Sequence, residues 1–95
     1  MSKLGSNNFF HIEYLDTVVD KDIPSLPITA RDRIKRAIET RLSADPIGLG
    51  KPLRYSFKGH RRIRVGDYRI IYRVDNDKKT VTIILIKHRK HVYDE

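Results

Sequence analysis

The chain has 95 residues, of which 39% are hydrophobic and 34% are charged, so it is long enough for one small hydrophobic core and too short for two. It contains no cysteine, which excludes disulfide bonds and thiolate chemistry. No apolar run approaches the roughly 18 residues that a membrane-spanning helix needs, and the N-terminal residues lack the apolar core of a signal peptide. These features predict a single domain over residues 1–95 that is cytoplasmic and has no membrane partner.

The net charge of +8 is concentrated in the second half of the chain. Residues 1–50 hold seven Lys and Arg against seven Asp and Glu, whereas residues 51–95 hold thirteen against five. Charge gathered on one part of a small fold is expected where a protein binds a polyanion. A nucleic acid is therefore the favoured partner, and an acidic protein is the alternative.

The first half of the chain predicts one strand followed by two helices. Aromatic and branched residues alternate over about 8–14, which is typical of a strand. Apolar residues at helical spacing over 15–23 predict a short helix that ends before a proline. A second helix is expected over about 28–44, with Thr29 as its N-cap and Asp32 in the capping-box position. Its apolar stripe consists of Ile34, Ala37, Ile38 and Leu42.

The second half predicts a loop and then three antiparallel strands. Asp45-Pro46 ends the helix, and the glycines that follow indicate a loop over 47–52. The strands are expected at about 60–66, 67–75 and 80–88, with turns at Gly66-Asp67 and at 76–79. The order of strand, two helices and three-stranded meander predicts a small α+β sandwich, with the helices packed on one face of the sheet.

The two-residue turn at Gly66-Asp67 sets the register of the first two meander strands. It places Val65 opposite Tyr68 and Arg64 opposite Arg69. One face then carries the core residues Val65, Ile63, Tyr68, Ile70, Tyr72 and Val74. We call the other face, which carries Arg62, Arg64, Arg69, Ile71 and Arg73, the arginine face.

The third meander strand continues this pattern if Asp75 lies opposite Thr80. Its core residues are then Val81, Ile83 and Leu85. The residues that join the arginine face are Thr82, Ile84, Ile86 and His88. A slip of one residue in this strand reverses the assignment, because successive side chains alternate between the faces.

Arg64 and Arg69 form a like-charge pair, which costs a few tenths to about 1 kcal/mol directly across two strands. A solvated face tolerates such a pair, because the long side chains splay apart in water. A bound phosphate removes the repulsion, and the planar guanidinium matches its oxygens bidentately. We therefore interpret the arginine face as a site for phosphate groups.

Three segments resemble the signature of the RelE/ParE superfamily of toxins: HRRIRVGDYRIIYRV (60–74), KPLR (51–54) and IKHRKHVY (86–93). The resemblance implies a RelE-like fold and a cognate antitoxin that wraps the toxin in a hetero-oligomer. For the RelE branch it implies cleavage of mRNA in the ribosomal A site, by attack of a 2′-hydroxyl on the adjacent phosphate. For the ParE branch it implies inhibition of DNA gyrase without nuclease activity. A degenerate member that acts only as antitoxin partner or co-repressor is a third possibility.

The resemblance also implies functional positions. The two basic residues before the turn fall on Arg62 and Arg64, where a well-known RelE type has lysines, and the arginine after the turn falls on Arg69. The basic residue near the end of the last strand falls on His88 or Arg89, and the tyrosine that stacks on the substrate base falls on Tyr93.

The residues themselves suggest how the chemistry is divided. Arginine stays protonated, so it stabilises phosphate charge well and transfers protons poorly. We expect His88 or His91 to act as base or acid, because an unperturbed imidazole titrates at about pH 6.5. Further RNA contacts are assigned to Arg54, Lys58, His60, Arg61, Arg73, Lys87 and Lys90. No cofactor or metal is expected, because no carboxylate or cysteine neighbours the histidines at ligand spacing.

Overall fold

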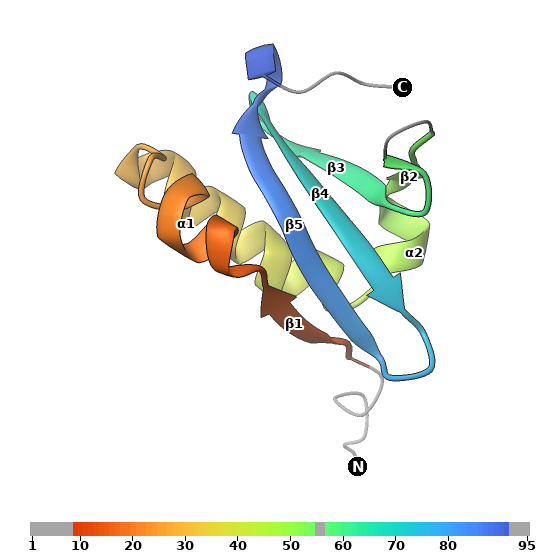
Figure 1. Ribbon diagram of the computed structural model, residues 1–95. Helices are drawn as coiled ribbons and strands as arrows, with labels where there is room; N and C mark the ends of the chain where they lie inside the picture. The colour runs from red at the N-terminus through yellow and green to blue at the C-terminus, as the bar shows by residue number, and fades with distance from the viewer. Residues whose placement is uncertain (1–8, 55–56, 92–95) are drawn as a thin grey trace.

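The computed structural model describes residues 9–54 and 57–91, which form a five-stranded mixed sheet with helices on one face (Figure 1). The strands lie in the order β1-β5-β4-β3-β2. They are His11–Tyr14 (β1), Lys51–Pro52 (β2), Arg61–Val65 (β3), Tyr68–Asp75 (β4) and Thr80–His88 (β5). β1 pairs with β5 in parallel, and the other neighbouring strands are antiparallel. The predicted α+β architecture is confirmed.

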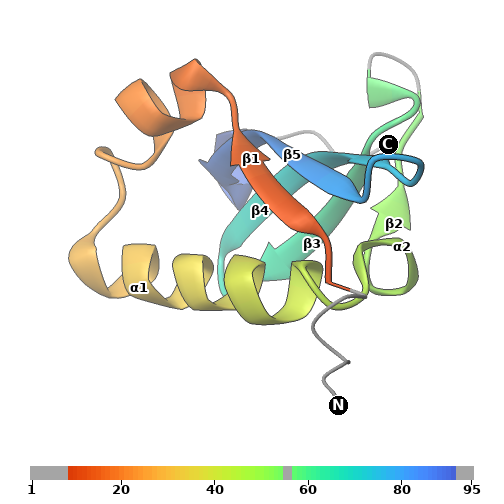
Figure 2. The ribbon, with the colours of Figure 1, turned by 90° about the horizontal axis from the view of Figure 1, so that it is seen from below.

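The main helical segment runs along one face of the sheet, as Figure 2 shows from below. It consists of α1 (Ile28–Ala37) and a wider turn, η3 (Ile38–Leu42), which continues it, in agreement with the helix predicted over 28–44. The shorter helical pieces are η2 (Val18–Asp22), α2 (Pro46–Leu49) and η5 (Arg89–His91). None of the helices described is both long and apolar enough to cross a bilayer.

The hydrophobic core lies between this helical segment and the sheet. The predicted apolar stripe is buried in full: Ile34, Ala37, Ile38 and Leu42. The sheet contributes Ile63, Val65, Ile70, Tyr72, Val81, Ile83 and Ile86. Burying one such side chain contributes about 1.5–3 kcal/mol, so the core decides which face of the sheet turns toward the helices.

The start of α1 differs from the prediction that Thr29 caps it. Pro27 occupies the N-cap position and no side chain caps the helix, so Thr29 lies inside its first turn. The Arg31 N–H donates to the Pro27 carbonyl at 2.8 Å, so the helical hydrogen bonds begin two residues earlier than an N-cap at Thr29 would place them.

Asp45-Pro46 begins a helix where only a loop was predicted. The Asp45 side chain accepts a hydrogen bond from the Gly48 N–H at 2.9 Å, and Pro46 occupies the first helical position, where its missing N–H has no cost. The segment over 47–52 thus contains most of α2 and all of β2.

The register of β3 against β4 is the predicted one, with Val65 opposite Tyr68 and Arg64 opposite Arg69. Gly66 lies in the turn with a φ of 59°, a conformation that glycine adopts without strain. The arginine face and the core face of these two strands are therefore confirmed.

β5 begins in the predicted register, with Asp75 opposite Thr80, but a bulge then interrupts its pairing with β4. Tyr72 pairs with Ile83 and Ile71 pairs with Leu85, so Ile84 is the extra residue.

Beyond the bulge the side chains of β5 exchange faces. Ile86 pairs with Ile70 and is buried in the core, and His88 pairs with Tyr68 on the same side. Leu85, which pairs with Ile71, lies on the arginine face instead of in the core. The predicted faces of Leu85, Ile86 and His88 are therefore wrong.

Two side chains on the helix side of the sheet attach α2. The Arg61 guanidinium donates to the carbonyls of Ile47 at 2.6 Å and Gly50 at 2.7 Å. The Tyr72 hydroxyl donates to the Pro46 carbonyl at 2.6 Å. A Cβ at position 50 would collide with that hydroxyl, so glycine is required there. Burial raises the pKa of Tyr72, and the nearby Arg61 opposes this shift.

β1 pairs with β5 only as far as Ile83. Beyond that point, the side chain of Asp22 hydrogen-bonds to the edge of β5. Its carboxylate accepts a hydrogen bond from the Ile86 N–H at 3.0 Å and pairs with the Lys87 ammonium at 3.0 Å. Asp22 is 4% exposed, and its buried charge is satisfied by the Ile86 N–H and by the partly exposed Lys87 ammonium.

Candidate nucleic-acid interface

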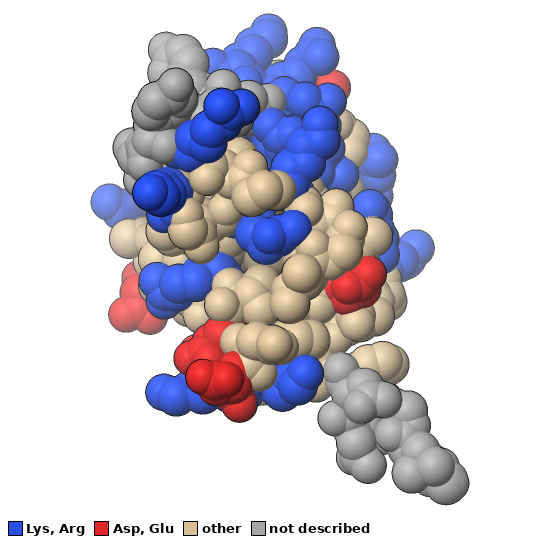
Figure 3. All heavy atoms as spheres, turned by 90° about the vertical axis from the view of Figure 1, so that its right-hand side faces the viewer, with Lys and Arg blue, Asp and Glu red and all other residues tan. Residues whose placement is uncertain are grey.

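The arginine face presents basic side chains in register across three strands. Arg64 on β3 lies opposite Arg69 on β4, and Arg69 lies opposite Lys87 on β5. In Figure 3, Lys and Arg crowd the upper half of the surface, and most of the Asp and Glu in view lie lower. On the side of the molecule that Figure 3 shows, most of the positive charge therefore gathers in one region.

The floor of this face is apolar and firmly packed. Ile71 lies between Arg62 and Leu85 in register and is fully buried. Arg62 is 7% exposed, whereas Arg64 and Arg73 are exposed to solvent. Because these arginines project from neighbouring strands, the order of their guanidinium groups is fixed. The groups can therefore bind phosphate oxygens in one orientation.

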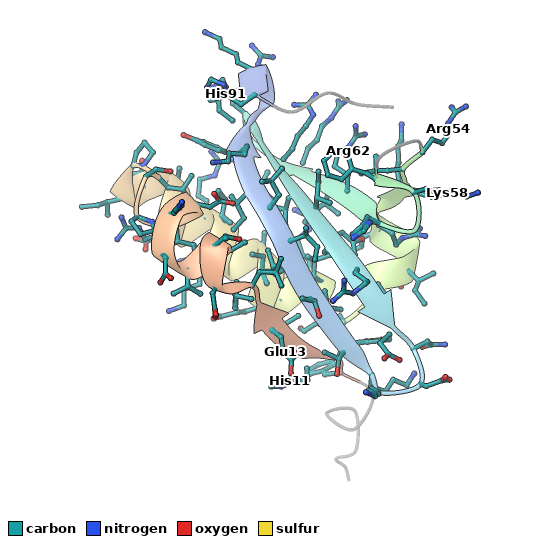
Figure 4. The ribbon with its side chains drawn as sticks, in the orientation of Figure 1. His11, Glu13, Arg54, Lys58, Arg62 and His91 are labelled. Atoms are coloured by element: carbon teal, nitrogen blue, oxygen red, sulfur yellow. The ribbon has the colours of Figure 1, made fainter. Side chains whose placement is uncertain are left out.

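The loop before β3 brings two more cations to the same side. Its backbone closes through hydrogen bonds from the Leu53 N–H to the His60 carbonyl and from the His60 N–H to the Phe57 carbonyl, both 2.9 Å long. Arg54 and Lys58 are exposed and project from this loop on the side of Arg62 (Figure 4). His60 is half-buried, with its ring edge-on to that of Phe57.

Two of the predicted RNA contacts are engaged elsewhere in the fold. The Arg61 guanidinium holds α2 on the helix side of the sheet. The Lys87 ammonium pairs with the buried Asp22 carboxylate. Arg73, by contrast, is exposed on the arginine face as predicted.

The two predicted catalytic histidines lie together on the helix side. The ring of His88 is edge-on to that of Tyr68, with 5.3 Å between centroids, and 6.5 Å from that of His91. Both histidines line a hollow of about 350 Å³ with Ser25 and Leu26. Figure 4 shows His91 on the side of η5 that faces away from Arg62. The bulge at Ile84 is the reason, because it turns His88 away from the face that carries Arg64 and Arg69.

The hydrogen bonding of His88 defines its tautomer. Its Nδ1 accepts a hydrogen bond from the Lys90 N–H at 3.2 Å. The proton of the neutral ring is therefore on Nε2. In the part of the chain that the structure describes, no three His, Asp or Glu side chains come together as a metal site would require.

The turn after β5 brings Arg89 to the β3–β4 turn. The Arg89 N–H donates to the Asp67 carbonyl at 2.8 Å, and the Arg89 side chain lies 3.8 Å from the Asp67 carboxylate. Lys90 is exposed beside it. Tyr93, the predicted base-stacking residue, lies outside the described residues.

The sequence did not point to two arginines of the helical segment that join this region. Arg33 places its guanidinium against Gly66 in the β3–β4 turn. Arg41 lines a hollow of about 190 Å³ beside Lys51, Arg62 and Arg64. Both side chains reach the sheet through tertiary packing, so no pattern within the helix sequence would have shown it.

Comparison with known proteins agrees with this architecture. The family model described as the ParE toxin of the type II toxin–antitoxin system parDE matches residues 16–93. Toxin RelG of Mycobacterium tuberculosis is 34% identical over 77 residues, which are 81% of this chain and 88% of RelG. Toxin RelE of the same bacterium is 32% identical over 90 residues, which are 95% of this chain and 92% of that toxin.

Solved structures show the same relationship. The RelBE2 toxin–antitoxin complex of Mycobacterium tuberculosis contains a chain that matches with a TM-score of 0.80 at 31% identity, over 85% of this chain and 99% of that one. The isolated E. coli RelE toxin matches with a TM-score of 0.68 at 20% identity, over 83% of each chain, and so shares the fold. The chain belongs to the RelE/ParE family of type II toxin–antitoxin toxins.

Proposed function

We propose that this toxin is a ribosome-dependent endoribonuclease that acts in the cytoplasm, cleaves mRNA in the A site and so stops translation. The observation that carries the proposal is the pair of Arg64 and Arg69, two basic residues that lie directly opposite each other on neighbouring strands of the arginine face. The relatives RelG and RelE, at 34% and 32% identity, support the RelE branch of the family.

In the proposed reaction the 2′-hydroxyl oxygen attacks the adjacent phosphorus and the bond to the 5′-oxygen breaks. The products are a cyclic phosphate and a 5′-hydroxyl. Negative charge grows on the phosphoryl oxygens in the transition state, and Arg64 and Arg69 stabilise it there. Tyr93 stacks on the base next to the cut, and the ribosome fixes the message in position for attack.

Proton transfer needs a group other than these arginines, because a guanidinium does not release its proton. His88 and His91 lie on the helix side of the sheet, away from Arg64 and Arg69. We therefore propose that the arginine face contributes charge stabilisation. The 2′-hydroxyl proton passes to solvent or to groups of the ribosome, and the leaving 5′-oxygen takes up a proton from the same sources.

The test adds purified toxin to programmed ribosomes and maps the message ends by primer extension, with naked mRNA as the control. Cuts are expected only on ribosomes and only in the A-site codon. Arg69→Gln should lower the cleavage rate about 10²–10³-fold, the usual effect of removing one group that stabilises an oxyanion. Equal cutting of naked mRNA, or an unchanged rate in Arg69→Gln, would contradict the proposal.

His88→Ala and His91→Ala test the division of labour within this mechanism. Each variant should retain cleavage to within about tenfold, whereas loss of a positioned base or acid costs about 10²–10⁴-fold. A loss of about 10²–10⁴-fold would show that the substituted histidine transfers a proton in the reaction.

A cognate antitoxin is the second proposed partner, and an apolar groove between η2 and α1 is where we place its apolar segment. The groove has a volume of about 380 Å³, and its apolar lining is Tyr14, Val19, Ile23, Leu26, Ile34, Ile38 and Ile86. Val19 is 49% exposed, and clustered apolar surface of this kind marks an interaction site. The toxin–antitoxin complexes of relatives, such as RelBE2, support the pairing.

Because apolar contacts resist salt, about 1 M salt should not release the toxin from its antitoxin. Val19→Asp should weaken co-purification of the two proteins, and the exposed Thr17→Asp is the matched control. Release by salt alone would instead indicate a purely electrostatic complex.

Inhibition of DNA gyrase is the second candidate function, because the matching family model is described as a ParE toxin. A supercoiling assay with stoichiometric toxin tests it. Inhibited supercoiling together with uncut messages on ribosomes would favour this function over mRNA cleavage.

A further inference from the structure

We propose that a second basic surface, formed by Arg33, Arg36 and Arg41, binds the phosphate backbone of an RNA segment that the toxin does not cleave. We call this surface the helix ridge. The inference rests on the proposed function, since it concerns how an RNA-directed toxin is held on a larger, structured RNA.

The helix ridge lines a hollow beside the edge of β3. The hollow has a volume of about 320 Å³, and its lining consists of Arg33, Arg36, Ala37, Thr40, Arg41 and Val65, with no acidic residue. The three arginines are exposed to solvent. At 1.5 Å per residue they span about 12 Å of helix, which matches about three or four successive charges of one nucleic-acid strand.

The Arg33 guanidinium packs against Gly66, but the charges of the three arginines are not paired within the described residues. In the part of the chain that the structure describes, no ion pair or hydrogen bond joins any of the three side chains to another group. Arg33 and Arg36 lie three residues apart and are neighbours on the helix surface, so their like charges repel each other. An anion between them would remove that repulsion.

The helix ridge is continuous with the arginine face. Arg41 lines both the ridge hollow and the neighbouring hollow that contains Lys51, Arg62 and Arg64. Among the described residues, β2 pairs only with Arg61 and Arg62, so it does not extend along the rest of the β3 edge between these two hollows. A polyanion can therefore contact the ridge and the arginine face at once.

The composition of the ridge favours RNA over a protein partner. Only Ala37 and Val65 are apolar in its lining, whereas protein interfaces depend on buried apolar and aromatic anchors. Such anchors lie in the groove that contains Val19, on another side of α1. Phosphate contacts need positive charge alone, and they position a protein without reading sequence.

The test measures binding of the full chain to a 2′-O-methylated RNA hairpin, which cannot undergo 2′-hydroxyl attack, as a function of salt. The triple variant Arg33→Gln, Arg36→Gln, Arg41→Gln is compared with Lys21→Gln, Lys35→Gln, Lys78→Gln, which removes equal charge elsewhere. Each lost phosphate contact should reduce the slope of log K against log salt by about 0.9, so the ridge variant should lose about 2–3. The lysine variant should keep the wild-type slope, and circular dichroism verifies that both are folded.

Equal slopes for the two variants would overturn the proposal. So would a ridge variant that binds the hairpin normally but no longer binds its antitoxin, because the surface would then belong to a protein interface. Cleavage is scored separately on programmed ribosomes, where the ridge variant should raise the toxin concentration needed for half-maximal cleavage and leave the saturated rate unchanged. The wild-type toxin could leave messages uncut while the ridge variant still lowers the salt dependence of hairpin binding. That result would refute the proposed nuclease function and support RNA binding by the helix ridge.

Discussion

The two faces of the sheet are built from alternate residues of the same strands and serve different ends. Ile70 and Arg69 are neighbours on β4, yet Ile70 is fully buried against the helices and Arg69 lies opposite Arg64 on the arginine face. On the first face, packing and hydrogen bonding stabilise the fold. On the second, basic side chains lie side by side across neighbouring strands. Substitutions on the two faces should therefore separate stability from binding.

Ile70→Ala should give the largest loss of stability. Removal of a fully buried branched side chain lowers the free energy of unfolding by about 2–5 kcal/mol, through lost burial and the cavity that remains. Urea denaturation measures the change. A loss below about 1 kcal/mol would mean that the helix side is not the main source of stability.

Asp22→Ala tests whether the buried polar groups beside β5 matter as much as apolar packing. The Ile86 N–H and the Lys87 ammonium would both lose their acceptor, and we expect a loss of about 1–3 kcal/mol in urea denaturation. Asp22→Asn keeps an acceptor for the Ile86 N–H, so its loss should be smaller. Equal losses in the two variants would assign the effect to the ion pair alone.

Tyr72→Phe should cost about 1 kcal/mol at neutral pH, because the Pro46 carbonyl loses its donor. Burial raises the pKa of Tyr72 above its ordinary value of 10.0, so the neutral phenol stabilises the fold. That contribution is present below pH 10 and is lost as the pH rises through the higher pKa of the folded state.

The alkaline loss of stability should therefore be smaller in Tyr72→Phe than in the wild type. Some of it should remain, because the pKa of Tyr14 is also raised, first by burial and then by Glu39. Melting temperatures between about pH 8 and pH 11 measure both effects. Identical pH profiles would show that Tyr72 does not titrate in this range.

Arg73→Gln, next to Tyr72 in the chain and on the opposite face, should have the smallest effect on stability. Exposed positions of this kind change the free energy of unfolding by less than about 0.5 kcal/mol. The same substitution should lower the salt dependence of RNA binding by about 0.9, the value for one phosphate contact. A large change in the free energy of unfolding with no change in RNA binding would mean that Arg73 serves stability and not binding.

The register of β3 against β4 was predictable because a glycine in a two-residue turn specifies it locally. The register of β5 was not, because the run Val81-Thr82-Ile83-Ile84-Leu85-Ile86 is apolar at nearly every position and gives no period that distinguishes the faces. The bulge at Ile84 lies within this run. Because of this bulge, the prediction that His88 lies on the arginine face is wrong.

Long-range contacts account for the other differences between prediction and structure. Asp22 meets the Ile86 N–H across 64 positions of sequence, and Arg61 serves α2 instead of the arginine face. Arg33 and Arg41 approach β3 only through the packing of the helical segment on the sheet. Clustered charge in the sequence identified the arginine face, but not the cations that extend it around the β3 edge.

The parallel pairing of β1 with β5 has a consequence for the order of folding. It joins residues 11–14 to residues 80–83, so β1 has no strand partner until β5 has been synthesised. Such distant pairings form late, because the intervening chain must first be closed into a loop. The apolar groove draws its lining from both ends of this span, from Tyr14 to Ile86. A nascent chain therefore lacks the complete groove, and a partner that binds there recognises only the finished toxin.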